Sequence, residues 1–357
     1  MKDNKLPKAC WLTINRACNL RCEWCYAQDT LFHDNDMSYD IATALIDMCV
    51  SCGIQNYLLI GGEPTIHPSF FDIIQYLNNK KCKVTIVTNG ILLHKEEFCK
   101  NLAKYKESLH VSISLKGAND DYYKNHCGAK AYHKVRVAIE NCRLFEIPFS
   151  ISYVISADNV ENIVTFANEL RSSGVTEKIS FSFCNETIDT SGEMSDVYSK
   201  HHPVMVNHLL SLQYNELNDA LNGDFTLHQT YPLCMCNDNV LSEMITRRQV
   251  STSCHVHNRS GVIFDTDGSI LLCNHFVGYG VGKFGVDYHD AETFIKFWES
   301  NEMLNLHKKL TSMPSLECSN CSKKEFCGGG CCIQWFAHTF DEYKSVFNDI
   351  EKSNPSI

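Results

Sequence analysis

Three cysteines near the N-terminus, Cys18, Cys22 and Cys25, carry the strongest chemical signal in this chain. Their spacing is C-x3-C-x2-C, and Trp24 and Tyr26 flank the last of them. Thiolates are the usual ligands of iron–sulfur clusters, and a cubane cluster needs four ligands. A loop that supplies three leaves one iron open, so the spacing indicates a cluster that also binds a small molecule. The triad taken alone also fits part of a zinc site.

A second cysteine-rich region lies in the last third of the chain. Cys254 is followed by Gly268-x4-Cys273, and then by a compact C-x2-C-x5-C-x3-C run. The run consists of Cys318, Cys321, Cys327 and Cys331. Its spacing suits either an iron–sulfur cluster or a zinc ribbon, because both are held by paired thiolates.

Composition indicates where such cysteines would be used. The 357 residues are 44% apolar and include 20 cysteines, and the formal net charge is −10. The sequence has no run of basic residues, no signal peptide and no transmembrane stretch, so we expect a cytoplasmic protein that binds neither nucleic acid nor a membrane. In the reducing cytoplasm, clustered cysteines point to metal binding and not to a disulfide framework.

The first half of the chain alternates strands and helices. Nearly continuous apolar runs, typical of parallel strands buried on both faces, predict the strands. They span residues 9–15, 56–60, 83–88, 109–115, 149–155 and 178–183. Helical spacing of apolar residues predicts the helices between them. They span residues 38–52, 69–80, 95–105, 131–145 and 160–172.

This alternation ends near residue 185, which predicts an α/β fold: a partial (β/α)6 TIM-like barrel followed by a small cysteine-rich domain. We assign residues 1–190 to the barrel, 191–250 to a linking helical region and 251–357 to the cysteine-rich domain. In barrels of this kind the chemistry lies at the C-terminal ends of the strands. The cysteine loop follows the first strand and Gly61-Gly62-Glu63-Pro64 follows the second, so we expect them to meet at one rim.

The triad, with an aromatic residue before its last cysteine, resembles the signature of the radical S-adenosylmethionine (SAM) superfamily. The resemblance implies that Cys18, Cys22 and Cys25 hold a catalytic [4Fe–4S] cluster whose open iron binds SAM, and that one electron releases a 5′-deoxyadenosyl radical. It also implies a cofactor-binding set of Trp24, Gly62, Glu63, Ser114 and His126. Two positions depart from the family pattern, since relatives usually have Asp at Lys116 and often Arg at His126.

The C-terminal cysteines resemble the SPASM extension of radical SAM enzymes, which holds auxiliary [4Fe–4S] clusters. The resemblance implies that Cys254, Cys273 and Cys331 ligate a first auxiliary cluster, and that Cys318, Cys321 and Cys327 ligate a second. The family pattern has a further cysteine downstream, but none follows Cys332 here. The remaining ligands stay open. For the first cluster they are Cys234, Cys236 or a site left for substrate; for the second they are Cys332, Asp341, His338 or an incomplete cluster.

The two resemblances together imply a radical SAM/SPASM oxidoreductase that modifies a ribosomally made peptide by a thioether or carbon–carbon crosslink or a related oxidation. Such an enzyme uses an electron donor such as flavodoxin or ferredoxin. The first strand starts within ten residues, so we expect a separate recognition protein or direct docking of a leader peptide. Small-molecule dehydrogenation is the alternative enzyme activity, and a zinc-binding protein is the non-enzyme alternative. Formylglycine formation is disfavoured because Asn274 occupies the position at which sulfatase maturases have an Asp that acts as a base.

Overall fold

The computed structural model describes residues 6–30, 35–188, 191–194 and 202–353, and it divides into two compact units. The first unit comprises Met1–Ser150, Ile188–Glu193 and Cys254–Lys309, and the second comprises Ile151–Thr187, Met194–Ser253 and Leu310–Ile357. The boundaries predicted from the sequence, 1–190, 191–250 and 251–357, stay a prediction. The first of them falls on residue 190, outside the described ranges.

The first unit is built on a mostly parallel sheet. Its strands, in spatial order, are β11 (Gly280–Lys283), β10 (Ser269–Leu271), β9 (Gly261–Phe264), β1 (Ala9–Asn15), β2 (Asn56–Gly61), β3 (Lys83–Thr88) and β4 (Leu109–Leu115). Strands β9, β1, β2, β3 and β4 run parallel, and β10 and β11 add an antiparallel edge. The register aligns Phe264, Leu12, Leu59, Ile86 and Val111 in one fully buried row. This row forms the centre of the core.

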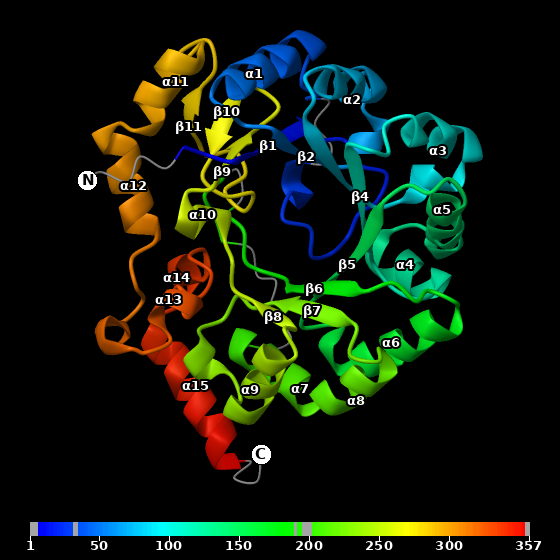
Figure 1. The fold of residues 1–357 in the computed structure, drawn as a ribbon. Helices are drawn as coiled ribbons and strands as arrows, with labels where there is room; N and C mark the ends of the chain where they lie inside the picture. Colours follow the sequence, from blue (N-terminus) through cyan, green and yellow to red (C-terminus); the bar gives the residue numbers. More distant parts are fainter. Residues whose placement is uncertain (1–5, 31–34, 189–190, 195–201, 354–357) are drawn as a thin grey trace. The chain divides into compact units, whose positions relative to one another are not determined.

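Helices flank the first sheet in the positions that strand–helix alternation requires. They are α1 (Tyr39–Ser51), α2 (Phe70–Asn79), α3 (Glu96–Ala103), α4 (Asp120–Cys127), α5 (Tyr132–Leu144), α10 (His255–Asn258), α11 (Ala291–Trp298) and α12 (Asn301–Leu310). Helices α1, α2, α3 and α5 lie along one side of strands β1 to β4 (Figure 1). Local sequence fixes their starts: Ser38 caps α1, and Asp290 and Thr293 form a capping box at α11.

The second unit contains strands β5 (Phe149–Ile155), β6 (Ile179–Phe183), β7 (Phe225–His228) and β8 (Val250–Ser251), all parallel. The alternation therefore does not end near residue 185 as we expected, because β7 and β8 extend the parallel order. The helices of this unit are α6 (Ile163–Ser172), α7 (Pro203–Leu212), α8 (Tyr214–Ala220), α9 (Asp238–Thr246), α13 (Lys324–Cys327), α14 (Gln334–Ala337) and α15 (Phe340–Ser353).

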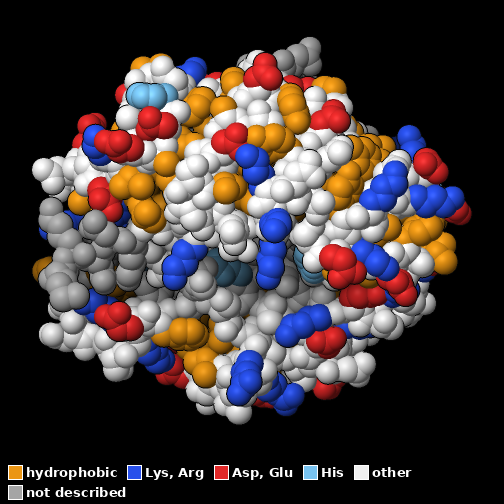
Figure 2. All heavy atoms as spheres, turned by 45° about the horizontal axis from the view of Figure 1, so that its top comes forward, with side chains coloured by type: hydrophobic (Ala, Val, Ile, Leu, Met, Phe, Trp, Pro, Cys, Tyr) orange, Lys and Arg blue, Asp and Glu red, His pale blue; other side chains and the backbone are white. Residues whose placement is uncertain are grey.

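The surface and the helices agree with the composition. On the face drawn in Figure 2, Lys and Arg side chains are interspersed with Asp and Glu side chains. Within the described ranges, no helix combines the length and the hydrophobicity needed to cross a bilayer.

Candidate active site and cluster-binding cysteines

The three N-terminal cysteines lie in one loop that begins directly after β1. The backbone N–H of Leu20 donates to the Cys18 Sγ at 3.4 Å, and the Cys25 N–H donates to the Cys22 carbonyl at 3.1 Å. Cys18 and Cys25 pack against the buried Ala27. One short segment thus presents all three thiols, as ligation of a single cluster requires, and their role as ligands stays a prediction.

The glycines after β2 allow the base of this loop to pack closely. A Cβ atom on Gly61 would lie 2.2 Å from the Asn15 Oδ1, and one on Gly62 would lie 2.3 Å from the carbonyl oxygens of Arg16 and Ala17. Real Cβ atoms do not approach other atoms so closely, so only glycine fits at either position. From the sequence we expected these glycines to admit a ligand; in the structure they admit the chain's own residues 15–17.

Glu63 joins the ends of two strands below the loop. Its side chain is 1% exposed. The carboxylate accepts hydrogen bonds from the Thr65 N–H, the Thr65 and Thr88 hydroxyls and the Asn89 N–H, at 2.5–3.1 Å. The Asn89 side chain in turn donates to the Asn19 Oδ1, inside the cysteine loop, at 2.7 Å. Burial raises the pKa of Glu63, and the four donors oppose that shift. Glu63 therefore fixes the scaffold that carries the loop.

The end of α4 docks on the cysteine loop from the other side. The Arg21 N–H donates to the Cys127 carbonyl at 2.8 Å, and the Glu23 N–H donates to the His126 carbonyl at 3.1 Å. Cys127 is not among the residues that the sequence assigned to the site. Its proximity to Cys22 was not predicted, because only the fold brings the end of α4 to the loop.

The aromatic residue before the last cysteine belongs to a small group of rings. The centroids of Trp24 and His126 lie 6.5 Å apart, and those of Tyr122 and His126 lie 4.3 Å apart. The His126 Nδ1 is also hydrogen-bonded to Glu23 at 2.8 Å. Trp24 and His126, both predicted to bind the cofactor, thus lie side by side at the loop.

Electrostatics within the loop differ from one thiol to the next. Burial raises the pKa of Cys18 to about 12 and also raises that of Cys25. The pKa of Cys22 is lowered to about 7, chiefly by its hydrogen bond with the Cys127 thiol and also by the positive charge of Lys116. Cluster ligands are thiolates, and the contacts of Cys22 favour that form whereas burial opposes it at Cys18 and Cys25.

Ser114 occupies the end of β4 as predicted. Burial alternates along this strand, and Ser112 and Ser114 share the less buried face. The Lys116 ammonium donates to the Ser114 hydroxyl at 2.6 Å. Lys116, which departs from the family pattern, is therefore in contact with Ser114, which the resemblance assigns to the cofactor-binding set.

Comparison with known proteins shows which protein families this chain is similar to. Residues 12–170 match the model of the Radical SAM superfamily. This stretch of the chain is similar to a radical SAM domain. Fe-coproporphyrin III synthase of Methanosarcina barkeri is 32% identical over 163 residues, which are 45% of this chain and 40% of that protein. The cysteine-type anaerobic sulfatase-maturating enzyme of Clostridium novyi is 22% identical over 88% of this chain and 84% of its own. The chain spans about half the length of the first curated relatives that it matches.

Solved structures extend the likeness to nearly the whole chain and confirm the fold prediction. Streptococcus suis SuiB bound to the precursor peptide SuiA has a TM-score of 0.68 and 16% identity, and it covers 94% of this chain and 74% of its own. The structure of anSMEcpe with bound AdoMet and Cp18Cys peptide has a TM-score of 0.67 and 20% identity, and it covers 96% and 99% of the two chains. At these identities the likeness establishes the fold. A radical SAM domain uses a [4Fe–4S] cluster and SAM, and the loop of Cys18, Cys22 and Cys25 fits that cluster.

The predicted first auxiliary set is divided between the units. Cys254 and Cys273 belong to the first unit, and Cys331 belongs to the second. Cys273 begins the turn after β10. In this turn Val277 packs against the radical SAM loop, and the rings of His275 and Tyr26 lie 5.5 Å apart. Cys273 is thus near the catalytic loop, and the ligand set as a whole stays a prediction.

The predicted second set lies within the second unit. Cys318 and Cys321 belong to one tight turn, in which the Cys321 N–H donates to the Cys318 carbonyl at 3.3 Å. Cys327 ends α13, and its N–H donates to the Lys323 carbonyl at 2.8 Å. All three thiols come from one short segment of residues 318–327, which is what a shared cluster requires.

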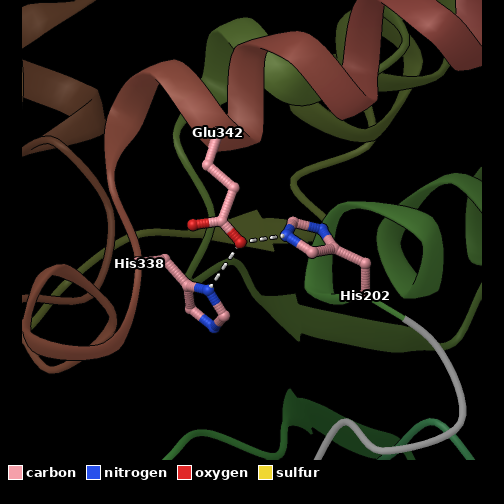
Figure 3. Close-up of side chains that lie close together, drawn as sticks. All are labelled: His202, His338 and Glu342. Atoms are coloured by element: carbon pink, nitrogen blue, oxygen red, sulfur yellow. Dashed lines mark hydrogen bonds and ion pairs between the residues drawn. The ribbon is translucent and has the colours of Figure 1, made fainter.

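His338, which we considered as a non-cysteine ligand, has other partners. Figure 3 shows His202, His338 and Glu342 turned toward one another, with both rings hydrogen-bonded to the Glu342 Oε1, at 3.3 and 3.2 Å. The other nitrogen of His338 is 2.8 Å from the buried Glu186. These carboxylates raise the pKa of His338, Glu186 contributing most. His338 therefore serves as a bridge between two acids.

One trio of side chains is close enough to share a metal ion. Among the residues that the structure describes, only His202, His338 and Glu342 have potential ligand atoms that all lie within 4.8 Å of one another. The choice between zinc and iron–sulfur clusters at the cysteines stays a prediction.

Proposed function

We propose that this chain is a radical SAM/SPASM maturase that oxidatively modifies a peptide, by a thioether or carbon–carbon crosslink or a related oxidation. One observation carries the proposal: the fold matches, over 94% and 96% of this chain, two structures that contain a bound peptide. Both matches extend through the cysteine-rich C-terminal region, beyond the radical SAM domain. The same region supports one or two auxiliary [4Fe–4S] clusters.

In this proposal the chain's own residues bind the catalytic cluster, hold the cysteine loop in place and shield the reaction from water. Cys18, Cys22 and Cys25 would hold the catalytic cluster, and Lys116 would favour the thiolate form of Cys22 and Cys25. Glu63 would keep the loop at the ends of β2 and β3. When bound, the cluster and SAM supply a 5′-deoxyadenosyl radical that abstracts hydrogen from the substrate. The apolar contacts around the loop would exclude water from that radical.

The remaining partners follow from this chemistry. An electron must reach the catalytic cluster, so we infer a donor such as flavodoxin or ferredoxin and a cytoplasmic location. The substrate would be a peptide recognised through a leader segment or through a separate binding protein. No nucleic-acid or membrane partner is needed.

The test is modification of a peptide by the reconstituted enzyme. The protein would be incubated anaerobically with SAM, dithionite and the short peptides encoded beside its gene. We expect one peptide to lose two hydrogens, as measured by mass spectrometry, and the Cys18→Ala variant to leave it unchanged. Formation of 5′-deoxyadenosine together with a product from a small molecule, and none from any peptide, would contradict the proposal.

Formylglycine formation is the neighbouring activity that the chain makes least plausible. Asn274 follows Cys273, and its Oδ1 is a buried atom with no hydrogen-bond partner among the described residues. An amide has no proton-accepting state at pH 7, whereas a carboxylate with a pKa near ~4 does. We predict no aldehyde from sulfatase-derived Cys or Ser peptides and little gain from Asn274→Asp alone. Mass spectrometry of the peptide checks this prediction. An aldehyde formed by the wild type would contradict it and would make sulfatase maturation the leading proposal.

Small-molecule chemistry is the second candidate. Fe-coproporphyrin III synthase and the GTP 3′,8-cyclases are among the curated relatives, at 30–32% identity. Their matches cover 44–46% of this chain, so they leave the cysteine-rich region unexplained. For this reason we rank peptide modification first.

A further inference from the structure

We propose that Cys234 is the fourth ligand of the second auxiliary [4Fe–4S] cluster, together with Cys318, Cys321 and Cys327. The inference rests on the auxiliary clusters of the proposed function and names a ligand that the sequence pattern does not supply. The SPASM pattern expects a later cysteine, and none follows Cys332. Cys234 lies 84 positions before Cys318, so only the fold can bring it into the set.

The segment that carries Cys234 lies directly against the cysteine run. The Leu233 N–H donates to the Cys327 Sγ at 3.3 Å, and the Cys331 N–H donates to the Thr230 carbonyl at 2.6 Å. A Cβ atom on Gly330 would lie 2.9 Å from that same carbonyl, so glycine allows this close approach. Both segments belong to the second unit, and their contact is therefore internal to it.

Cys234 directly follows Leu233, so it lies where this segment contacts the Cys327 sulfur. Its side chain is exposed. Packing around the thiol raises its pKa to about 11, and the thiols that raise it further are Cys327, Cys318 and Cys321. Charge–charge effects weaken with distance, so these contributions agree with the contact at Leu233.

The two rival cysteines are buried. Cys236 is 8% exposed and packs with Leu233 and Leu241 in an apolar cluster that Cys327 also contacts. Its Sγ accepts a hydrogen bond from the Gln229 amide at 2.7 Å. Cys332 is 4% exposed, and its thiol is hydrogen-bonded with that of Cys331. Of the three residues, Cys234 alone has an exposed side chain beside the cysteine run.

An ion pair connects the cysteine run to the neighbouring helix. Lys323, between Cys321 and Cys327, forms an ion pair with Asp238 at 2.9 Å and so ties the cysteine run to the start of α9.

The experiment removes the catalytic cluster so that only auxiliary iron is counted. The parent is the full chain with Cys18, Cys22 and Cys25 changed to Ala, reconstituted anaerobically, and we expect it to bind about eight irons. Adding Cys234→Ala should either remove about one iron and produce the paramagnetic signal of an oxidised [3Fe–4S] cluster, or remove about four irons with loss of the whole cluster. Adding Cys236→Ala instead should leave the iron content and the spectrum of the parent unchanged. Circular dichroism of both variants checks that they fold.

Each contrary outcome has a distinct meaning. Full iron and an unchanged spectrum in the Cys234→Ala variant would overturn the ligand assignment while leaving the auxiliary clusters intact. The same would follow if Cys236→Ala, and not Cys234→Ala, lost iron. A parent with no C-terminal iron, or with zinc in its place, would overturn both this assignment and the auxiliary clusters of the proposed function.

Discussion

The residues around the loop of Cys18, Cys22 and Cys25 make close contacts within the chain itself. Gly61 and Gly62 leave room for residues 15–17, and Glu63 accepts four hydrogen bonds from its own scaffold. The Gly61-Gly62-Glu63 motif, which the sequence suggested would contact a ligand, thus determines the position of the cysteine loop. Disturbing the motif should displace the loop even before SAM is added.

Gly62→Ala tests this role. The new Cβ would collide with two backbone carbonyls, and we expect a loss of about 1–3 kcal/mol in the free energy of unfolding. We also expect loss of the iron held by Cys18, Cys22 and Cys25. The control is Gly53→Ala: Gly53 has a φ of 83° but open space around it, so the change should cost about 1–2 kcal/mol with full iron content. Equal iron in the two variants would contradict the account.

Single residues also show where sequence reasoning stops. The spacing of Cys18, Cys22 and Cys25 predicted one shared loop, because ligands so close in sequence cannot separate. The sequence did not place Cys127 beside the loop, and it offered Cys234 only as a ligand of the first auxiliary cluster. Each lies far from its cysteine partners in the chain, and only tertiary packing brings them together.

At the scale of elements, a buried ion pair joins the ends of two parallel strands. Arg16, just after β1, and Asp265, just after β9, lie 2.6 Å apart with side chains 4% and 14% exposed. The positive charge of Arg16 also acts on Cys25. The pair therefore anchors the start of the cysteine loop to the neighbouring strand.

Asp265→Ala should leave the Arg16 charge buried without its partner. We expect roughly 3–5 kcal/mol lower stability, measured by anaerobic urea denaturation. Asp267→Ala is the matched control, because its ion pair with Lys283 is about half exposed and should contribute about 0–1 kcal/mol. Similar costs for the two variants would show that the buried pair is not an anchor.

His338 makes the attachment of α15 depend on pH. The pKa of His338 in the folded protein is raised above the unfolded value of ~6.5. Protonated His338 therefore contributes its full stabilisation of the folded protein at pH values below ~6.5. This contribution is lost as the pH rises through the folded pKa. Burial lowers the pKa of the neighbouring His202, which makes the opposite contribution.

His338→Ala should therefore destabilise the protein by about 1–3 kcal/mol at pH 6 and by less at pH 8.5. The measurement is the urea midpoint at each pH. His289→Ala removes an exposed histidine beside Asp290 and should change the midpoint little at either pH. A larger effect of His338→Ala at pH 8.5 than at pH 6 would refute the bridging role.

The elements that the sequence predicted well have strong local signals. Continuous apolar runs with β-branched residues placed β1, β3, β4 and β5 at the observed bounds. The strand β7 was missed because Phe225–His228 is only four residues long and half of them are partly exposed. Helix α4 was missed because only Tyr123 and Cys127 of its eight residues are buried, too few for an amphipathic pattern.

At the scale of the whole molecule, the cysteines fall into two groups with different structural settings. The radical SAM loop, Cys254 and Cys273 belong to the first unit, while residues 318–332 and Cys234 belong to the second. The sequence located both groups, since each is a tight cluster of thiols. It could not assign the segments of residues 188–193 and 310–357 to their units, because that assignment depends on contacts between distant parts of the chain.

The central claim is that the loop of Cys18, Cys22 and Cys25 generates a radical from SAM. The most direct measurement is 5′-deoxyadenosine, quantified by chromatography after the anaerobically reconstituted protein is incubated with dithionite and SAM. We predict that the wild type forms it, and that the variant with all three cysteines changed to Ala forms none while keeping about two-thirds of the iron. Wild-type protein with its full complement of iron and no 5′-deoxyadenosine, even with candidate peptides present, would contradict the account.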